Sequence, residues 1–152
     1  MPAAFDPAPN NLGIVTDPHW LTEMCAARWP EAKVTGVRIV ETIVTQATKV
    51  RIALDIAGGT DDLPRNICIK GILTSTGAPA TASVVETLFY RDLARQIPVR
   101  VPPCIHAGLN SAGDNGVIVM HDIIHAGGTF LSALKPFTPD ETRESLEQIA
   151  LL

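Results

Sequence analysis

The most regular alternation of hydrophobic and polar residues in the chain runs from Lys49 to Ile56. Successive side chains of a strand point to opposite faces, so this alternation predicts a strand with one buried face and one solvated face. The wider segment 34–57 is rich in valine, isoleucine and threonine, and polar residues 45–48 interrupt it. We therefore expect two strands joined by a polar turn.

Three further segments have the composition of strands. Residues 66–73 follow a turn rich in glycine and aspartate at 58–62. Segments 104–109 and 116–123 are separated by asparagine, serine, glycine and aspartate, which favour turns. These segments bring the expected number of strands to five.

Helix signals occur near both ends of the chain. Asp17 is suited to cap a helix that Pro30 ends. Near the other end, Thr138 and Glu141 have the spacing of a capping box, in which each side chain bonds the backbone of the other. The apolar stripe of this last helix has barely begun at Leu152, so we expect the helix to face a partner.

The middle of the chain carries a third helix signal, over residues 80–97, after a Gly-Ala-Pro breaker at 77–79 and before Pro98. The order of elements predicts an α+β fold with a five-stranded, mostly antiparallel sheet and one packed helix. We divide the chain into an N-terminal extension with a helix (1–33), the sheet unit (34–123), and a linker followed by a helix (124–152).

Composition excludes several classes of protein. The chain has 152 residues, is 46% hydrophobic and has a formal net charge of −4, so a basic nucleic-acid-binding surface is not expected. It lacks an apolar run of the roughly 18 residues that a membrane span requires, and its N-terminus does not resemble a secretory signal. We expect a cytoplasmic protein whose three cysteines, Cys25, Cys68 and Cys104, are buried free thiols.

Lys70 and Glu86 are the first candidates for chemistry. Lys70 interrupts an apolar strand, although a lysine at a sheet edge often buries its stem and keeps its ammonium in water. A helical projection places Glu86 in the centre of an apolar stripe, within about 60° of its apolar neighbours. These neighbours are Ala82, Phe89, Tyr90, Leu93 and Ile97. An ionised carboxylate there needs a partner, unless Glu86 lies at the margin of a shorter stripe and reaches solvent.

A lysine on the third strand and a glutamate on the following helix form the ion pair of a kinase nucleotide-binding lobe. With this pair, the segments LPRNICIKG (63–71), ETLFYRDL (86–93) and VIVMHDI (117–123) resemble the aminoglycoside phosphotransferase superfamily. They are most similar to its ecdysteroid-kinase-like and bacterial phosphotransferase branch. Residues 99–102 and 129–134 fit the same pattern, and the resemblance covers residues 34–152.

The resemblance implies a role in ATP binding for each matching residue. Lys70 would contact the nucleotide phosphates, and Glu86 would orient Lys70. The turn with Thr45, Gln46 and Thr48 would cover the phosphates, although it also fits an ordinary hairpin turn and no G-x-G-x-x-G run is present.

The resemblance also implies a hinge, the segment that joins the two lobes of the family and reads the adenine edge through its backbone. It corresponds here to Met120, His121, Asp122 and Ile123, with His121 where family members usually have glutamate. His121 and His125 do not predict a metal site, because residues four apart on a strand are separated by about 13 Å.

The family's catalytic loop, H-G-D-x-x-x-x-N, and its later metal-binding aspartate do not occur in the sequence. We therefore expect the N-terminal lobe of a small-molecule kinase, with the helix at Thr138 beginning a missing C-terminal lobe. That second lobe would bind Mg²⁺ and a small substrate whose hydroxyl receives the γ-phosphate. The alternatives are a non-catalytic interaction or dimerisation module, which would form a homodimer through the exposed lobe surface, and an α+β domain in which Lys70 and Glu86 are a structural pair.

Overall fold

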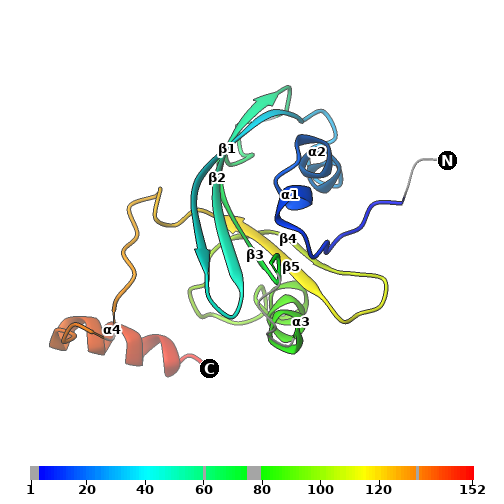
Figure 1. Cartoon of the computed structure of the whole chain (residues 1–152). Helices are drawn as coiled ribbons and strands as arrows, with labels where there is room; N and C mark the ends of the chain where they lie inside the picture. The colour runs from blue at the N-terminus through cyan, green and yellow to red at the C-terminus, as the bar shows by residue number, and fades with distance from the viewer. Residues whose placement is uncertain (1–3, 60, 75–79, 133) are drawn as a thin grey trace.

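The computed structural model describes residues 4–59, 61–74, 80–132 and 134–152. Its strands form one sheet in the order β1-β2-β3-β5-β4, and every neighbouring pair is antiparallel (Figure 1). They are β1 (Lys33–Val44), β2 (Thr48–Ala57), β3 (Asn66–Gly71), β4 (Cys104–Leu109) and β5 (Gly116–His121). The predicted α+β class and five-stranded antiparallel sheet are confirmed, although β3 and β5 each end two residues earlier than predicted.

Two short helices precede the sheet. α2 (Pro18–Ala26) is capped by Asp17 as predicted. The Asp17 carboxylate accepts hydrogen bonds from the N–H groups of His19 and Trp20. α1 (Leu12–Val15) was not predicted, since four residues are too few for a periodic pattern. Beyond the sheet, α4 (Pro139–Ile149) begins with the predicted capping box of Thr138 and Glu141.

The helix predicted over residues 80–97 is shorter and less regular than expected. α3 (Thr81–Leu88) continues into a π-helical turn, Phe89–Leu93, and the following residues form turns. The buried positions of α3 are Ser83 and Thr87, and Leu93 is 53% exposed, so the predicted apolar stripe centred on Glu86 is wrong. The π-helical turn shifts the angular positions of all later residues, and the breaker at 77–79 lies outside the described residues.

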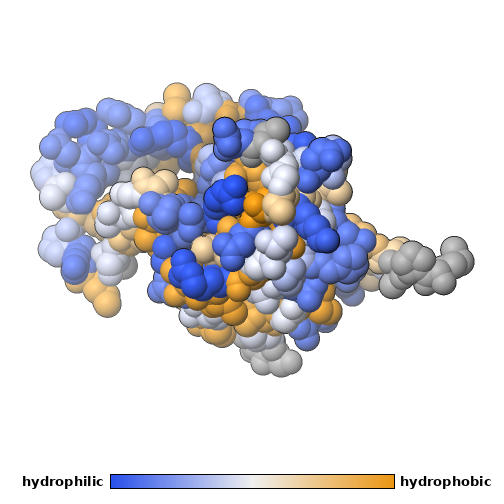
Figure 2. Space-filling model, turned by 90° about the horizontal axis from the view of Figure 1, so that it is seen from above, coloured by the Kyte–Doolittle hydropathy of each residue, from blue (hydrophilic) through white to orange (hydrophobic). Residues whose placement is uncertain are grey.

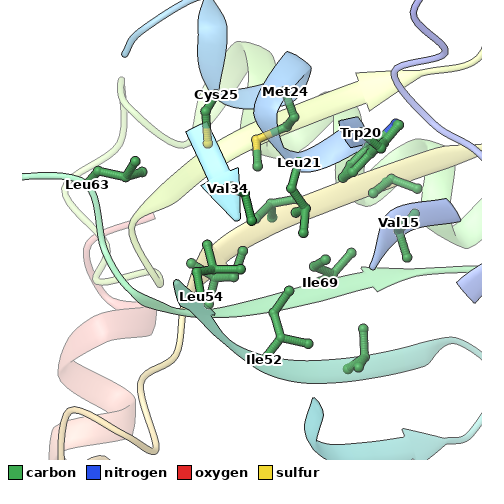
Figure 3. Close-up of a cluster of buried hydrophobic side chains, with 14 of the residues drawn as sticks. Val15, Trp20, Leu21, Met24, Cys25, Val34, Ile52, Leu54, Leu63 and Ile69 are labelled. Atoms are coloured by element: carbon green, nitrogen blue, oxygen red, sulfur yellow. The ribbon is translucent and has the colours of Figure 1, made fainter. Parts of the chain in front are cut away.

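The hydrophobic core lies between one face of the sheet and the helices α1 and α2 (Figure 3). Its sheet side consists of alternating residues of the central strands, which include Val50, Ile52, Ile67, Ile69, Val117 and Val119. Its helix side includes Val15, Trp20, Leu21, Met24 and Cys25. Residues of the extension 1–33 therefore share one core with the sheet unit. Of the three free thiols, Cys25 is buried as predicted, whereas Cys68 and Cys104 are half-buried.

The C-terminal segment is separate from this core. In Figure 1, α4 lies apart from the sheet at the end of an extended linker. A hydrogen bond from the N–H of Arg100 to Gln148 Oε1, at 2.8 Å, connects α4 to the rest. Figure 2, which views the molecule from above, shows hydrophilic residues over much of the surface, with smaller hydrophobic areas between them. Within the described ranges, no helix has the length and apolar character needed to cross a membrane.

Candidate functional site

The candidate site lies on the face of the sheet opposite α1 and α2. Strand pairing arranges its side chains in two neighbouring rows that cross the sheet from β1 to β5. The first row is Ile43, Lys49, Lys70 and Ile118, and the second is Glu41, Arg51, Cys68 and Met120. Alternation along each strand gives these residues a common face, while their neighbours in sequence face the core.

The predicted pair of Lys70 and Glu86 is formed. Lys70 Nζ lies 2.7 Å from each oxygen of the Glu86 carboxylate, and the two side chains are 24% and 32% exposed. Glu86 reaches Lys70 because α3 packs closely on β5 at Gly116, beside Ser83 and Thr87. Glu86 therefore lies at the margin of the buried face of α3, and the lysine compensates its charge.

A cavity of about 360 Å³ with both polar and apolar walls lies on one side of this pair, and we call it the polar cavity because both lysines and the β1–β2 turn border it. Its lining includes Thr45, Gln46 and Ala47 from the β1–β2 turn, together with Lys70 and Glu86. The Thr45 hydroxyl donates to the Ala47 carbonyl at 2.9 Å. The N–H groups of Gln46 and Ala47 have no protein acceptor in the part of the chain that the structure describes, so they are available to a ligand.

Thr48 does not join the other predicted residues of the turn. It is fully buried on the core face of β2, where its hydroxyl shares a hydrogen bond of 3.0 Å with the Thr74 hydroxyl. The structure therefore places Thr45 and Gln46 beside Lys70, and directs the Thr48 side chain to the opposite face of the sheet.

An apolar cavity of about 210 Å³ lies on the other side of the pair of Lys70 and Glu86. The four predicted hinge residues, Met120, His121, Asp122 and Ile123, all contribute to its lining. Its other apolar walls come from Ile43, Tyr90, Ile124 and Phe130. The cavity thus joins residues that are far apart in sequence, and Lys70 and Glu86 border both cavities.

Most backbone groups of the hinge already have partners. The N–H groups of His121 and Asp122 donate to the carbonyls of Pro103 and Asn66, and the Ile123 carbonyl accepts from the N–H of Gly128. Within the described ranges the N–H of Ile123 donates to no protein group, so it is the available hinge donor beside the apolar cavity.

The side chains of Asp122 and His121 are not placed to contact a ligand in the apolar cavity. The buried Asp122 carboxylate accepts two bonds from Arg51 Nε, at 3.0 and 3.1 Å, and bonds from the N–H groups of Ile124 and His125. Glu41 binds the same guanidinium at 2.7 Å, and these two carboxylates raise the pKa of Arg51, with Glu41 the larger cause. Pairing with Ile67 puts His121 on the core face.

Sequence reasoning missed Lys49, which lies directly opposite Lys70 in the register of β2 and β3 and borders both cavities. The period of two along β2 places Lys49 and Arg51 on one face, and this signal was present in the sequence. The site thus combines two lysines, one carboxylate and free N–H donors with an adjoining apolar cavity. The chemistry of such a set suits a ligand in which an anionic group is joined to an apolar ring.

A third cavity, of about 430 Å³, lies on the far side of Tyr90 between the π-helical turn and β4. It contains none of the predicted site residues, and Arg91 at its edge is bound by Asp92 at 2.8 Å. Burial raises the pKa of its Cys104 thiol to about 11, so this thiol is a poor nucleophile near neutral pH.

No family model, no curated protein and no solved structure matches this chain. The function proposed below therefore depends on the geometry of the site and on the chemistry of its residues. Across the described residues, no group of three or more histidine, cysteine, aspartate or glutamate residues is placed to hold a metal ion.

Proposed function

We propose that this chain is the ATP-binding lobe of a small-molecule kinase similar to the aminoglycoside phosphotransferases. The observation that carries the proposal is the ion pair of Lys70 and Glu86 at 2.7 Å, located between a polar and an apolar cavity. A lysine on the third strand and a glutamate on the following helix have this arrangement in protein kinases, where the lysine holds the nucleotide phosphates.

The two cavities suit the two parts of ATP. In the polar cavity, Lys70 contacts the phosphates and Glu86 fixes the position of its ammonium, while the N–H groups of Gln46 and Ala47 donate to phosphate oxygens. In the apolar cavity, adenine stacks against apolar side chains such as Met120 and accepts a hydrogen bond from the N–H of Ile123.

Transfer of the γ-phosphate to a substrate hydroxyl needs a base and ligands for Mg²⁺. The carboxylates of this site do not fit a metal ion, because Glu86 is held by Lys70 and both Glu41 and Asp122 are held by Arg51. The proposal therefore assigns the base, the metal ligands and the site for the hydroxyl substrate to a second lobe. Nucleotide binding is the step that this chain performs.

Calorimetric titration of the chain with ATP and with adenosine tests the proposal. We expect ATP to bind more tightly than adenosine, and Lys70→Met to weaken ATP binding about tenfold while adenosine binding is retained. Lys33→Met is the matched control, because Lys33 is an exposed lysine at the start of β1. An ATP affinity that is unchanged in Lys70→Met, or no binding of either compound, contradicts the proposal.

The C-terminal segment favours the interaction module as a second candidate function. Phe130, Leu134 and Leu152 are 68%, 95% and 83% exposed, and the apolar side chains of α4 are also exposed. Several large apolar side chains exposed on one segment are typical of a surface that binds another protein. Sedimentation over a range of concentrations tests this candidate, since a monomer at every concentration argues against self-association.

A further inference from the structure

Two lysines occupy adjacent positions in the first row of the site. Lys49 on β2 is the direct register partner of Lys70 on β3. Like charges directly opposite each other on neighbouring strands destabilise a sheet. A sequence that keeps such a pair violates a local rule of sheet stability, and violations of this kind occur at functional sites.

No carboxylate among the described residues pairs with Lys49. Glu86 binds Lys70, while Glu41 of the second row and Asp122, the residue after β5, bind Arg51. Among the residues that the structure describes, Lys49 makes no ion pair and no side-chain hydrogen bond. The polar cavity therefore has an excess positive charge that an anion would neutralise.

The position of Lys49 suits an anion with several charged groups. It comes two residues after Ala47, whose N–H has no protein acceptor, and it borders the same cavity as Lys70. Donors thus occur along the cavity from the turn, through Lys49, to Lys70. A chain of linked phosphates presents acceptor oxygens at intervals along such a line, whereas a single carboxylate does not.

We propose that Lys49 is a second phosphate-binding residue and forms, with Lys70, a two-lysine site for a polyphosphate chain. The assignment of that chain to ATP rests on the proposed function, but the two-lysine site itself does not. Lys49 neutralises the phosphate farther from Glu86, and Lys70 holds the one nearer to it. The ligand class is a linear polyphosphate, either as part of a nucleotide or free.

Titration with sodium tripolyphosphate, ATP and adenosine tests the proposal. We expect Lys49→Met to weaken the binding of both polyphosphates about tenfold and to change adenosine binding much less, because adenosine carries no phosphate. Lys49→Arg keeps the charge and restores most of the affinity, and Lys33→Met, at an exposed lysine outside the cavity, has no effect. Without ligand, Lys49→Met unfolds at an equal or higher urea concentration, because it removes a repulsion.

The outcomes separate this inference from the proposed function. Unchanged binding of tripolyphosphate and ATP by Lys49→Met overturns the inference, even if Lys70→Met loses ATP. Failure of the wild-type chain to bind tripolyphosphate also overturns it. A third outcome supports the two-lysine site and overturns the proposed function. In that outcome, tripolyphosphate binding depends on Lys49, ATP binds no more tightly than tripolyphosphate, and adenosine does not bind.

Discussion

Replacing Gly116 with alanine tests how the fold positions Glu86. Gly116 begins β5 and faces α3, and a β-carbon there would lie 2.6 Å from the Ser83 carbonyl oxygen and closer still to Thr87 Oγ1. Ordinary contacts begin at 3.4 Å. Alanine at this position therefore requires α3 to move away from the sheet.

The size of the movement follows from these distances. Restoring the Ser83 contact from 2.6 to 3.4 Å needs a shift of about 0.8 Å. Glu86 lies between Ser83 and Thr87 on α3, so the same shift would lengthen its 2.7 Å contact with Lys70 to at most about 3.5 Å, longer than a typical hydrogen bond. Overpacking of this kind costs about 1–3 kcal/mol in the free energy of unfolding.

Urea denaturation measures this loss, and Thr87→Ala is the matched partner variant. The Thr87 hydroxyl is buried without a hydrogen-bond partner among the described groups, so Thr87→Ala alone costs little. In the double variant it removes the closest clashing atom and recovers part of the loss, while the Ser83 carbonyl still clashes. Full stability of Gly116→Ala, or strictly additive losses in the double variant, would refute the proposed packing of α3 on β5.

Three further predictions concern other parts of the molecule. Arg51→Met lowers the free energy of unfolding by about 3 kcal/mol, because it leaves the buried Asp122 carboxylate without its cation, and adding Asp122→Asn recovers part of that loss in urea denaturation. Burial lowers the pKa of His106 below its ordinary 6.5, so the unfolded chain binds the proton more readily. The stability linked to His106 is present above about pH 6.5 and is lost as the pH falls, and His106→Gln flattens the dependence of unfolding on pH in that window. Leu146→Glu with Ile149→Glu leaves the melting temperature of the sheet unit unchanged, since both side chains are exposed on α4, and lowers any self-association seen by sedimentation.

The strands were predictable because their side chains differ between the two faces of the sheet. The alternation from Lys49 to Ile56 located β2 and its buried face correctly. The helix caps at Asp17 and Thr138 were also predictable, because each depends on a few neighbouring residues.

Contacts between distant segments were harder to predict. The adjacency of Lys49 and Lys70 depends on the register of β2 and β3, which are joined by a connection of eight residues (58–65) whose conformation no local pattern fixes. The centre of the buried face of α3 depends on the close approach to Gly116, about 30 residues away in sequence. A helical projection contains no information about the contact with Gly116, and so it placed Glu86 in the centre of the buried stripe.

The predicted hinge, residues 120–123, was also predictable only in part. The sequence correctly predicted the start of a strand at Gly116 but extended it to Ile123, whereas β5 ends at His121. The burial of Asp122 against Arg51 joins β2 to the end of β5, and it became visible only once the sheet order was known. Of the predicted hinge contacts, the N–H of Ile123 is the backbone donor that the fold leaves available.

A titration of the ¹⁵N-labelled chain with ATP, followed by the amide resonances, tests the central claim most directly. The account predicts that the largest shifts occur at Gln46, Ala47, Lys70 and Ile123, which border the two cavities on either side of the ion pair. The Lys70→Met variant should lose the shifts of the turn while retaining a response at Ile123 to adenosine. Shifts confined to α4, or no shifts at millimolar ATP, would contradict nucleotide binding at this site.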